Sequence, residues 1–310
     1  MAEQPSFVQF PHPGREREVA EGQDHVEWSR GDHTRKFLRA NGAYVTADGQ
    51  VADGPVAFWG EWEPPSRVVH AFAAAGGGQP RWLHEPHWRF PGPAAGFNNT
   101  DPLVFGDHFT YSNCRQANPN QRNLHDLKEG SLVLFGSGRK NGPEWEFILD
   151  TVLVTDGPPD DYTPAAGIPG CESVVQGVVL DPLRADPEWS GFKFARYRGR
   201  TFREAPKGPF SFVPCKPCGD VSSCAFARPV IKLEEPPTAP DNPWLRPPAV
   251  MVARCQHADP DQLLRIWTEV VEQVRARGLA LGVHMEVPEA DGGTAATESA
   301  PTRARHPGHC

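Results

Sequence analysis

The chain has 310 residues, and its 34 prolines and 30 glycines together make up about a fifth of it, well above the usual share. Because both residues interrupt helices, this composition excludes a helical bundle or a coiled coil and favours strands joined by long, ordered loops. The formal charge of −8 excludes nonspecific coating of nucleic acid or anionic lipid, so such a partner would need a local basic patch. No apolar run approaches the length needed to cross a bilayer.

Strand signals begin near the N-terminus, where residues 6–10 are rich in β-forming side chains. Residues 42–51 carry an Asp-Gly pair between β-branched positions, which predicts a hairpin. Residues 131–137 and 144–155 are apolar runs that we expect to form a second hairpin near the centre of the sheet. Further short apolar runs predict strands at 174–180, 209–215 and 229–233.

The C-terminal third adds a strap, a helix and a tail. Residues 232–250 are dense in proline and predict an extended strap over the surface. A wide apolar face at helical spacing predicts one helix, capped by Asp259 or Asp261 and ended by Gly278, with a strand over 279–287 behind it. We expect residues 1–287 to form one α+β domain on a curved, mainly antiparallel sheet or small barrel with few helices, followed by a disordered tail over 288–310.

The N-terminus has no basic stretch followed by an apolar one, so we expect no signal peptide and a cytoplasmic location. The seven cysteines then predict reduced thiols. Cys215, Cys218 and Cys224 include one pair at zinc-knuckle spacing, but half a motif favours a loop with free thiols over zinc. Cys114 would be a nucleophile only beside a histidine, and His108 and His125 are near in sequence; a buried small hydrophobe is the alternative.

The segment from Phe58 to Ser66 combines aromatic rings with carboxylates. In a strand, Trp59, Glu61 and Glu63 would share one face, with Trp62 on the other. Such a face suits a pocket wall, because rings stack on flat ligands and carboxylates accept hydrogen bonds or act as general acid or base. An amphipathic edge strand with a core tryptophan explains the same pattern equally well.

A second polar cluster lies between apolar strands, and its members are Asn99, Thr100, Asp101, Tyr111, Ser112 and Asn113. Buried amides and hydroxyls need partners, and a bound ligand is one such partner. An Asx turn is the structural alternative. For Asp101 and Asn113 the sequence favours ligand binding and a structural role equally.

Two runs interleave cations with aromatic residues, a pattern that suits a phosphate backbone with stacked bases. The nucleic-acid contacts predicted from them are His33, Arg35, Lys36, Arg196, Arg198 and Arg200. A solvated strand face with inward rings is the commoner explanation of each run alone. The fingerprints of dinucleotide-binding, P-loop, zincin and α/β-hydrolase proteins are missing, and we expect no metal and no cofactor.

Over residues 7–285 the chain resembles a family of uncharacterised bacterial proteins. The resemblance lies in the blocks FVQFPHPG, HTRKFL, FWGEWEPPS, NTDPLVFGD, YSNC, FSFVPC and FARPVI. That resemblance implies no established activity. Residues 127–136, with the hairpin ending at 150–152, also resemble part of the PUA, EVE and ASCH group of small β-barrels. This second resemblance implies a barrel around a nucleobase pocket and binding of RNA or modified bases.

The sequence therefore leaves three functions open. The first is a nucleic-acid or modified-nucleobase binding protein of a defence or nucleotide-modification system, with Trp59, Trp62 and Tyr111 as its aromatic pocket. The second is an enzyme acting on a nucleotide, nucleoside or glycosidic substrate, with Glu61 and Asp101 as the first candidates for acid and base. The third is a structural protein whose proline strap and acidic surface serve a protein partner. We expect the first, with no membrane association.

Overall fold

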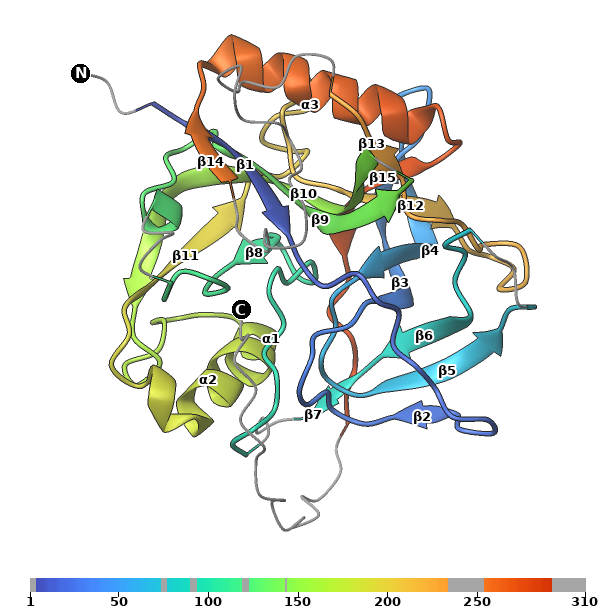
Figure 1. Cartoon of the computed structure of the whole chain (residues 1–310), viewed down its shortest axis with the longest axis horizontal. Helices are drawn as coiled ribbons and strands as arrows, with labels where there is room; N and C mark the ends of the chain where they lie inside the picture. Colours follow the sequence, from blue (N-terminus) through green and yellow to red (C-terminus); the bar gives the residue numbers. More distant parts are fainter. Residues whose placement is uncertain are drawn as a thin grey trace.

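The computed structural model describes residues 4–73, 77–89, 94–118, 123–142, 144–233 and 254–291. Two seven-stranded sheets dominate it, and a two-stranded ribbon is added near the end of the described chain. Most strand pairs are antiparallel; the parallel ones are β1 with β9, β3 with β6 and β16 with β7. The predicted class, α+β with mainly antiparallel strands on a curved sheet or small barrel, is confirmed (Figure 1).

The first sheet has the order β14-β1-β9-β10-β11-β8, with β13 paired to β10. Its centre is the predicted hairpin, in which β9 and the long β10 pair antiparallel. The strands are β1 (Ser6–Pro11), β8 (Thr110–Tyr111), β9 (Leu132–Asn141), β10 (Glu144–Tyr162), β11 (Phe194–Gly199), β13 (Val230–Ile231) and β14 (Arg254–His257).

The second sheet has the order β15-β12-β4-β3-β6-β5-β2. Because β15 pairs with both β12 and β3, the four strands β3, β4, β12 and β15 close into a small barrel. The predicted Asp-Gly hairpin joins β3 to β4. The strands are β2 (His25–Val26), β3 (Lys36–Val45), β4 (Val51–Gly60), β5 (Ser66–Ala71), β6 (Trp82–Pro86), β12 (Val213–Pro217) and β15 (Ala280–Met285).

The predicted helix is α3 (Pro260–Arg275), which lies across one face of the first sheet (Figure 1). Asp259 is its N-cap: its carboxylate accepts from the Gln262 backbone N–H, and the Gln262 side chain completes a capping box. Ile266, Val270 and Val274 lie on its buried stripe, so burial of one face stabilises the helix in place.

The prediction of a strand at 174–180 is wrong. These residues form α1 (Ser173–Val175) and a π-helical turn over Gln176–Leu180, continued by α2 (Asp181–Ala185) and a 3-10 turn over Pro187–Trp189. A short, fully buried apolar run has no exposed face to reveal its period, so its residues alone do not separate a helix from a strand.

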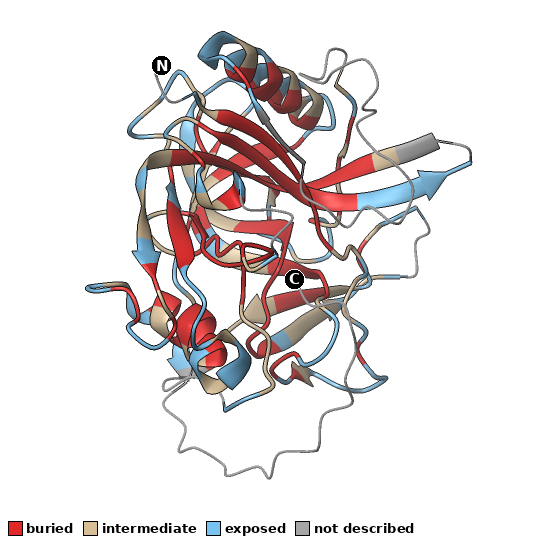
Figure 2. Cartoon of the chain, turned by 60° about the vertical axis from the view of Figure 1, so that its left-hand side comes forward, coloured by how far each residue is buried: buried red, intermediate tan, exposed pale blue. Residues whose placement is uncertain are grey.

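Two apolar clusters lie on opposite faces of the first sheet. Along β9, Leu132 and Leu134 join the cluster beneath α3, and Val133 and Phe135 join the other, as the strand period of two requires. Figure 2 shows the buried residues concentrated in the strands below α3 and on the sheet-facing side of that helix.

Two predictions concern the C-terminal part of the chain. The proline-rich strap lies outside the described residues beyond position 233, as does the predicted tail beyond position 291. Within that tail, β16 (Ala290–Asp291) pairs with β7 (Trp88–Arg89), so ordered pairing continues past the predicted domain end at 287. No helix of the described residues is long and apolar enough to span a membrane.

Candidate functional site

The two polar segments singled out in the sequence lie side by side. The Asp101 backbone N–H donates to Glu61 Oε1 at 3.3 Å, and the Glu63 backbone N–H donates to Thr100 Oγ1 at 3.1 Å. All four side chains are buried. The fold therefore brings together residues about forty positions apart, but it packs them against each other and not around an open hollow.

A thiol, an imidazole and a carboxylate lie in one row within this packed region. Cys114 Sγ lies 2.8 Å from His12 Nε2, and His12 Nδ1 lies 2.8 Å from Glu61 Oε2. His12 follows β1, Glu61 follows β4, and Cys114 follows β8, so three strand ends place the three groups. Their exposed fractions are only 1–4%. This is the arrangement by which a histidine, oriented by a carboxylate, takes the proton of a nucleophile.

The charge on Glu61 fixes the tautomer of His12. Burial alone raises the pKa of Glu61, but the neighbouring His12, His33 and Arg35 hold that pKa well below its usual value. An ionised carboxylate only accepts hydrogen bonds, so His12 Nδ1 carries the proton that it donates to Glu61. In the neutral ring Nε2 is then the basic nitrogen, and it is the one that faces Cys114.

Two arginines support this row: Arg35 is buried, and the Arg228 side chain is 12% exposed. Arg35 Nη1 donates to Glu61 Oε2 at 2.6 Å, and Arg35 Nε donates to Asp150 Oδ2 at 2.8 Å. Arg228 Nη1 also donates to Asp150, at 3.1 Å, and its guanidinium lies 5.4 Å from the centre of the Trp59 ring. The network holds Glu61 in position by charge-assisted bonds in a region of low dielectric.

Asp101 holds the loop that carries Cys114. Its carboxylate accepts the backbone N–H of Ser112 at 2.9 Å, of Asn113 at 2.8 Å and of Cys114 at 2.6 Å. Burial raises the pKa of Asp101 to about 6, although these three donors lower it. The Cys114 N–H is thus committed to Asp101 and is not available to a negative oxygen developing on a substrate.

His33 and Glu63 extend the same region towards solvent. His33 Nδ1 lies 2.8 Å from Glu63 Oε1 and 3.2 Å from Glu61 Oε1, and its ring stacks on that of His12 with centroids 6.0 Å apart. The His33 side chain is 13% exposed, whereas Glu63 is fully buried. His33, Glu61 and Glu63 are the group in the described part of the chain whose donor atoms are close enough to hold a metal ion.

The three rings predicted to line a base pocket belong to the core. Trp59 packs on Phe37 at 5.3 Å between centroids, Trp62 on Phe105 at 4.9 Å, and Tyr111 stacks on Tyr197 at 5.8 Å. Their polar atoms donate to backbone carbonyls: Trp59 Nε1 to Phe226, Trp62 Nε1 to Pro65 and the Tyr111 hydroxyl to Cys114. All three are at most 4% exposed, so their faces stack on protein in this structure.

The predicted polar ligand residues bond largely to one another. Asn99 Nδ2 donates to Asn113 Oδ1, and Asn113 Nδ2 donates to Ser112 Oγ, each at 2.9 Å. Thr100 and Asp101 make the bonds described above. The structure thus gathers all five around the Cys114 loop, where they shape that loop, while their role as ligand contacts stays a prediction.

The predicted phosphate contacts do not form one surface. Arg35 and Lys36 are buried, and Lys36 Nζ donates to the Pro64 carbonyl at 2.9 Å, so neither reaches a phosphate in this structure. Arg196 is buried in ion pairs with Asp160 and Glu172, and Arg200 pairs with Glu129. Arg198 is exposed, while His33 belongs to the carboxylate group above.

Other arginines surround a cavity of about 170 Å³ beside this site. Its walls are Arg15, Arg17, Glu18, Arg30, Asp32 and Thr34. The last two flank His33 in sequence, and the Arg35 N–H that follows them donates to the Arg15 carbonyl at 2.8 Å. Three guanidinium groups against two carboxylates leave the rim net positive, in a protein whose overall charge is negative.

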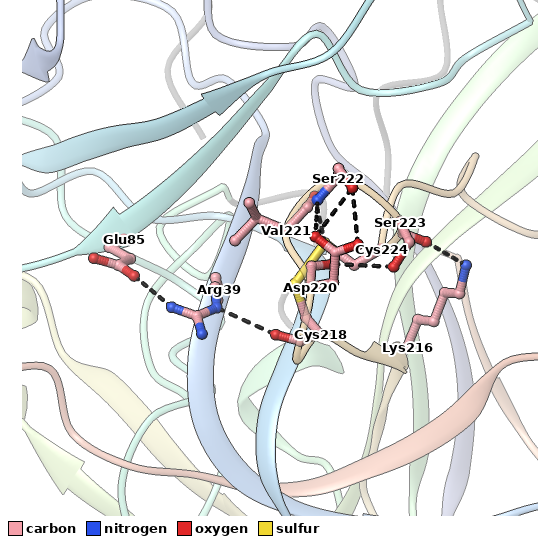
Figure 3. The surroundings of a disulfide bond; sticks show 9 residues. All are labelled: Arg39, Glu85, Lys216, Cys218, Asp220, Val221, Ser222, Ser223 and Cys224. Atoms are coloured by element: carbon pink, nitrogen blue, oxygen red, sulfur yellow. Dashed lines mark hydrogen bonds and ion pairs between the residues drawn. A yellow bond between two sulfur atoms is a disulfide. The ribbon is translucent and has the colours of Figure 1, made fainter.

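The expectation of fully reduced thiols is wrong at one place. Cys218 and Cys224 form a disulfide that closes a short loop after β12 (Figure 3). The loop is further held by Lys216 Nζ, which donates to the Ser223 carbonyl, and by Arg39, which donates to the Cys218 carbonyl. Two sulfurs bonded to each other are not thiolate ligands, so this form of the loop does not bind zinc. Cys114, Cys171 and Cys215 are free thiols.

The sequence left Cys114 open as a nucleophile only beside a histidine, and neither of the two histidines near it in sequence contacts it in the structure. His108 Nδ1 lies against the Gly199 carbonyl, and His125 Nε2 lies against the Gln116 carbonyl. The partner is His12, 102 positions away, and the available signal was its place in the FPHPG block, directly after a strand. No family model matches the chain, and no curated protein or solved structure does either. The resemblances to uncharacterised bacterial proteins and to PUA, EVE and ASCH barrels stay predictions.

Proposed function

We propose that the protein is a thiol-dependent enzyme in which Cys114 is the nucleophile, His12 the general base and Glu61 the residue that orients His12. One observation carries the proposal: the continuous row from Cys114 Sγ through both ring nitrogens of His12 to Glu61, with 2.8 Å at each step. This row meets the geometric requirement for nucleophilic catalysis, in which nucleophile and base lie within hydrogen-bond reach and a third group orients the base.

The chemistry that suits this row is transfer of an acyl group. As Cys114 sulfur attacks the carbonyl carbon of an ester or amide, its proton passes to His12 Nε2 and a C–S bond forms. The bond to the leaving group breaks with its electron pair on the leaving atom, which takes the proton from His12. Water then forms a C–O bond to the thioester carbon as His12 accepts its proton. The C–S bond breaks with its electron pair on sulfur, His12 gives the proton to Cys114, and the carboxylic acid leaves. Glu61 stabilises the imidazolium at both stages.

In this proposal the substrate approaches from the side of His33. Among His12, His33, Glu61, Glu63 and Cys114, His33 is the most exposed side chain, and its ring stacks on that of His12. Cys114 itself is 3% exposed, so a substrate reaches it only when the covering side chains move aside.

The experiment compares two buried thiols in the same protein. Cys114 and Cys215 are both free and at most 3% exposed, but no histidine among the described residues bonds to Cys215, and burial raises the pKa of its thiol. With Cys171, Cys255 and Cys310 replaced by serine, native protein is treated briefly with iodoacetamide and mapped by peptide mass spectrometry. We expect label on Cys114 before Cys215. Equal labelling of the two, with full labelling after denaturation, contradicts the proposal.

A second candidate function is recognition of a nucleotide or nucleic acid, and the arginine-lined cavity favours it. Arg15, Arg17 and Arg30 are the cations that a phosphate approaching His33 would meet first. Binding of a fluorescent single strand should weaken as salt rises and fall in the triple Arg→Ala variant. Binding that is absent at low salt, or that survives the triple substitution unchanged, rules this candidate out.

A further inference from the structure

We infer that His33, Glu61 and Glu63 form a binding site for one divalent transition-metal ion. The three donor atoms lie within 4.8 Å of one another. They come from the loop before β3 and from the segment directly after β4, which is the neighbour of β3 in the barrel. Strand pairing therefore fixes their positions, although His33 is about thirty residues from the carboxylates in sequence.

The spacing of the donor atoms fits a single ion. Ligands at about 2.1 Å from a metal are separated by about 3.0 Å at octahedral angles and about 3.4 Å at tetrahedral angles. His33 Nδ1 lies 2.8 Å from Glu63 Oε1 and 3.2 Å from Glu61 Oε1, so both separations have the size that a shared ion imposes.

Hydrogen bonding alone leaves this group incomplete. His33 Nδ1 has at most one proton, and a single proton cannot be directed fully at two carboxylates. Glu63 is fully buried, and its second oxygen, Oε2, has no hydrogen-bond partner in the described part of the chain. A buried carboxylate oxygen without a partner costs free energy, and a cation held by both oxygens of Glu63 would recover it.

Neighbouring hydroxyls show the same deficit. Ser29 Oγ and Thr34 Oγ1 are also buried and lack partners among the described residues. The Ser29 backbone N–H donates to the Glu63 carbonyl at 2.8 Å, and Thr34 follows His33 directly. Three orphaned polar atoms thus belong to Glu63, to a residue bonded to its backbone and to the residue that follows His33, which favours ordered groups, such as a metal ion with its water ligands, completing this region.

The donor set selects the metal. One imidazole nitrogen with two carboxylate oxygens and no thiolate suits Mn²⁺, Co²⁺ or Zn²⁺ better than Mg²⁺, which prefers oxygen alone. Three protein ligands leave positions open for water, as in metal sites that do chemistry. The ion would reach the site from solvent past the partly exposed His33 side chain. The other Glu61 oxygen stays on His12 and Arg35, so metal and triad share one carboxylate.

The test is a Co²⁺ titration of chelator-treated full-length protein, followed by visible absorption and by metal analysis. We expect one Co²⁺ per chain, a spectrum of nitrogen and oxygen ligation, and little displacement by Mg²⁺. Glu63→Gln and His33→Asn should each weaken binding by about 10-fold or more. His25→Asn is the matched control, because His25 pairs with Glu27 on the surface at 3.1 Å.

Circular dichroism establishes whether each variant is folded. If Glu63→Gln unfolds, His33→Asn still tests the site, because His33 is partly exposed and its replacement disturbs the core less. The inference is overturned if wild type binds less than one Co²⁺, if both variants bind like wild type, or if sulfur-to-cobalt bands appear. Neither readout depends on the reactivity of Cys114, so failure of this site and failure of the proposed enzyme are separate results.

Discussion

Arg35→Met removes the centre of the buried ion network. Arg35 is 1% exposed and donates to Glu61 at 2.6 Å and to Asp150 at 2.8 Å. Burial alone lowers the pKa of Arg35, but the two carboxylates raise it above its usual value, so the guanidinium stays charged. Methionine keeps much of the side-chain length but leaves both carboxylates without this cation.

The expected loss of stability is about 3–4 kcal/mol. Two hydrogen bonds to charged groups contribute about 1.5–3 kcal/mol each. Breaking a buried pair by removing one partner costs about 3–5 kcal/mol because the remaining charge is uncompensated. Glu61 keeps His12 and Asp150 keeps Arg228, so the lower half of this range applies.

The assay is urea unfolding at neutral pH, with Arg39→Met as the matched control. Arg39 lies on β3, which begins directly after Arg35, and pairs with Glu85 at 2.7 Å, but both side chains are more than a quarter exposed. An exposed pair contributes about 1 kcal/mol or less. If Arg35→Met costs no more than Arg39→Met, the buried network does not hold the site as described.

Two further predictions concern stability. Burial, with the nearby positive charges of Lys36 and Arg17, lowers the pKa of His84 to about 3. Between pH 6.5 and 3 the His84 side chain therefore binds a proton in the unfolded chain but not in the folded one. The free energy of unfolding falls as the pH drops through this range, and the contribution of His84 to the loss is about 2 kcal/mol at pH 5. In His84→Leu this part of the slope in pH-dependent unfolding should vanish, and an unchanged slope contradicts the assignment. In Gly136→Ala the new Cβ would overlap the Ile148 carbonyl oxygen on the paired strand, well inside van der Waals contact, so we expect a loss of about 1–3 kcal/mol in urea unfolding. Gly191→Ala is the control, because open space surrounds that position and the substitution should cost little. Equal losses in the two variants would contradict the predicted steric overlap.

The sequence was sufficient to predict the elements that have one buried and one exposed face or a local turn signal. The α3 helix has a buried and an exposed stripe and a capping box at Asp259, and all of these are local. The hairpin of β9 and β10 is also local, since a short turn joins two apolar runs. The residues at 174–180 gave no such contrast because nearly all of them are buried.

The site depends on contacts that are far apart in the chain. The sequence proposed Glu61 and Asp101 as acid and base of one site, and the structure brings their two polar segments into contact, although packed together without a hollow between them. His12 stands alone in its segment, and its contact with Cys114 depends on long-range strand pairing in the first sheet, including that of β1 with β9. The sequence suggested that the tryptophans line a pocket, because a large ring can pack in a core or stack on a ligand. Their burial in the structure shows that they pack in the core.

The measurement that tests the central claim most directly is the rate at which iodoacetamide alkylates Cys114 in wild type, His12→Asn and His108→Asn. If His12 activates the thiol, His12→Asn should slow alkylation by about 100-fold, the contribution of a positioned general base. His108→Asn, which removes a histidine that bonds to Gly199, should react like wild type. Equal rates in all three proteins would contradict the account.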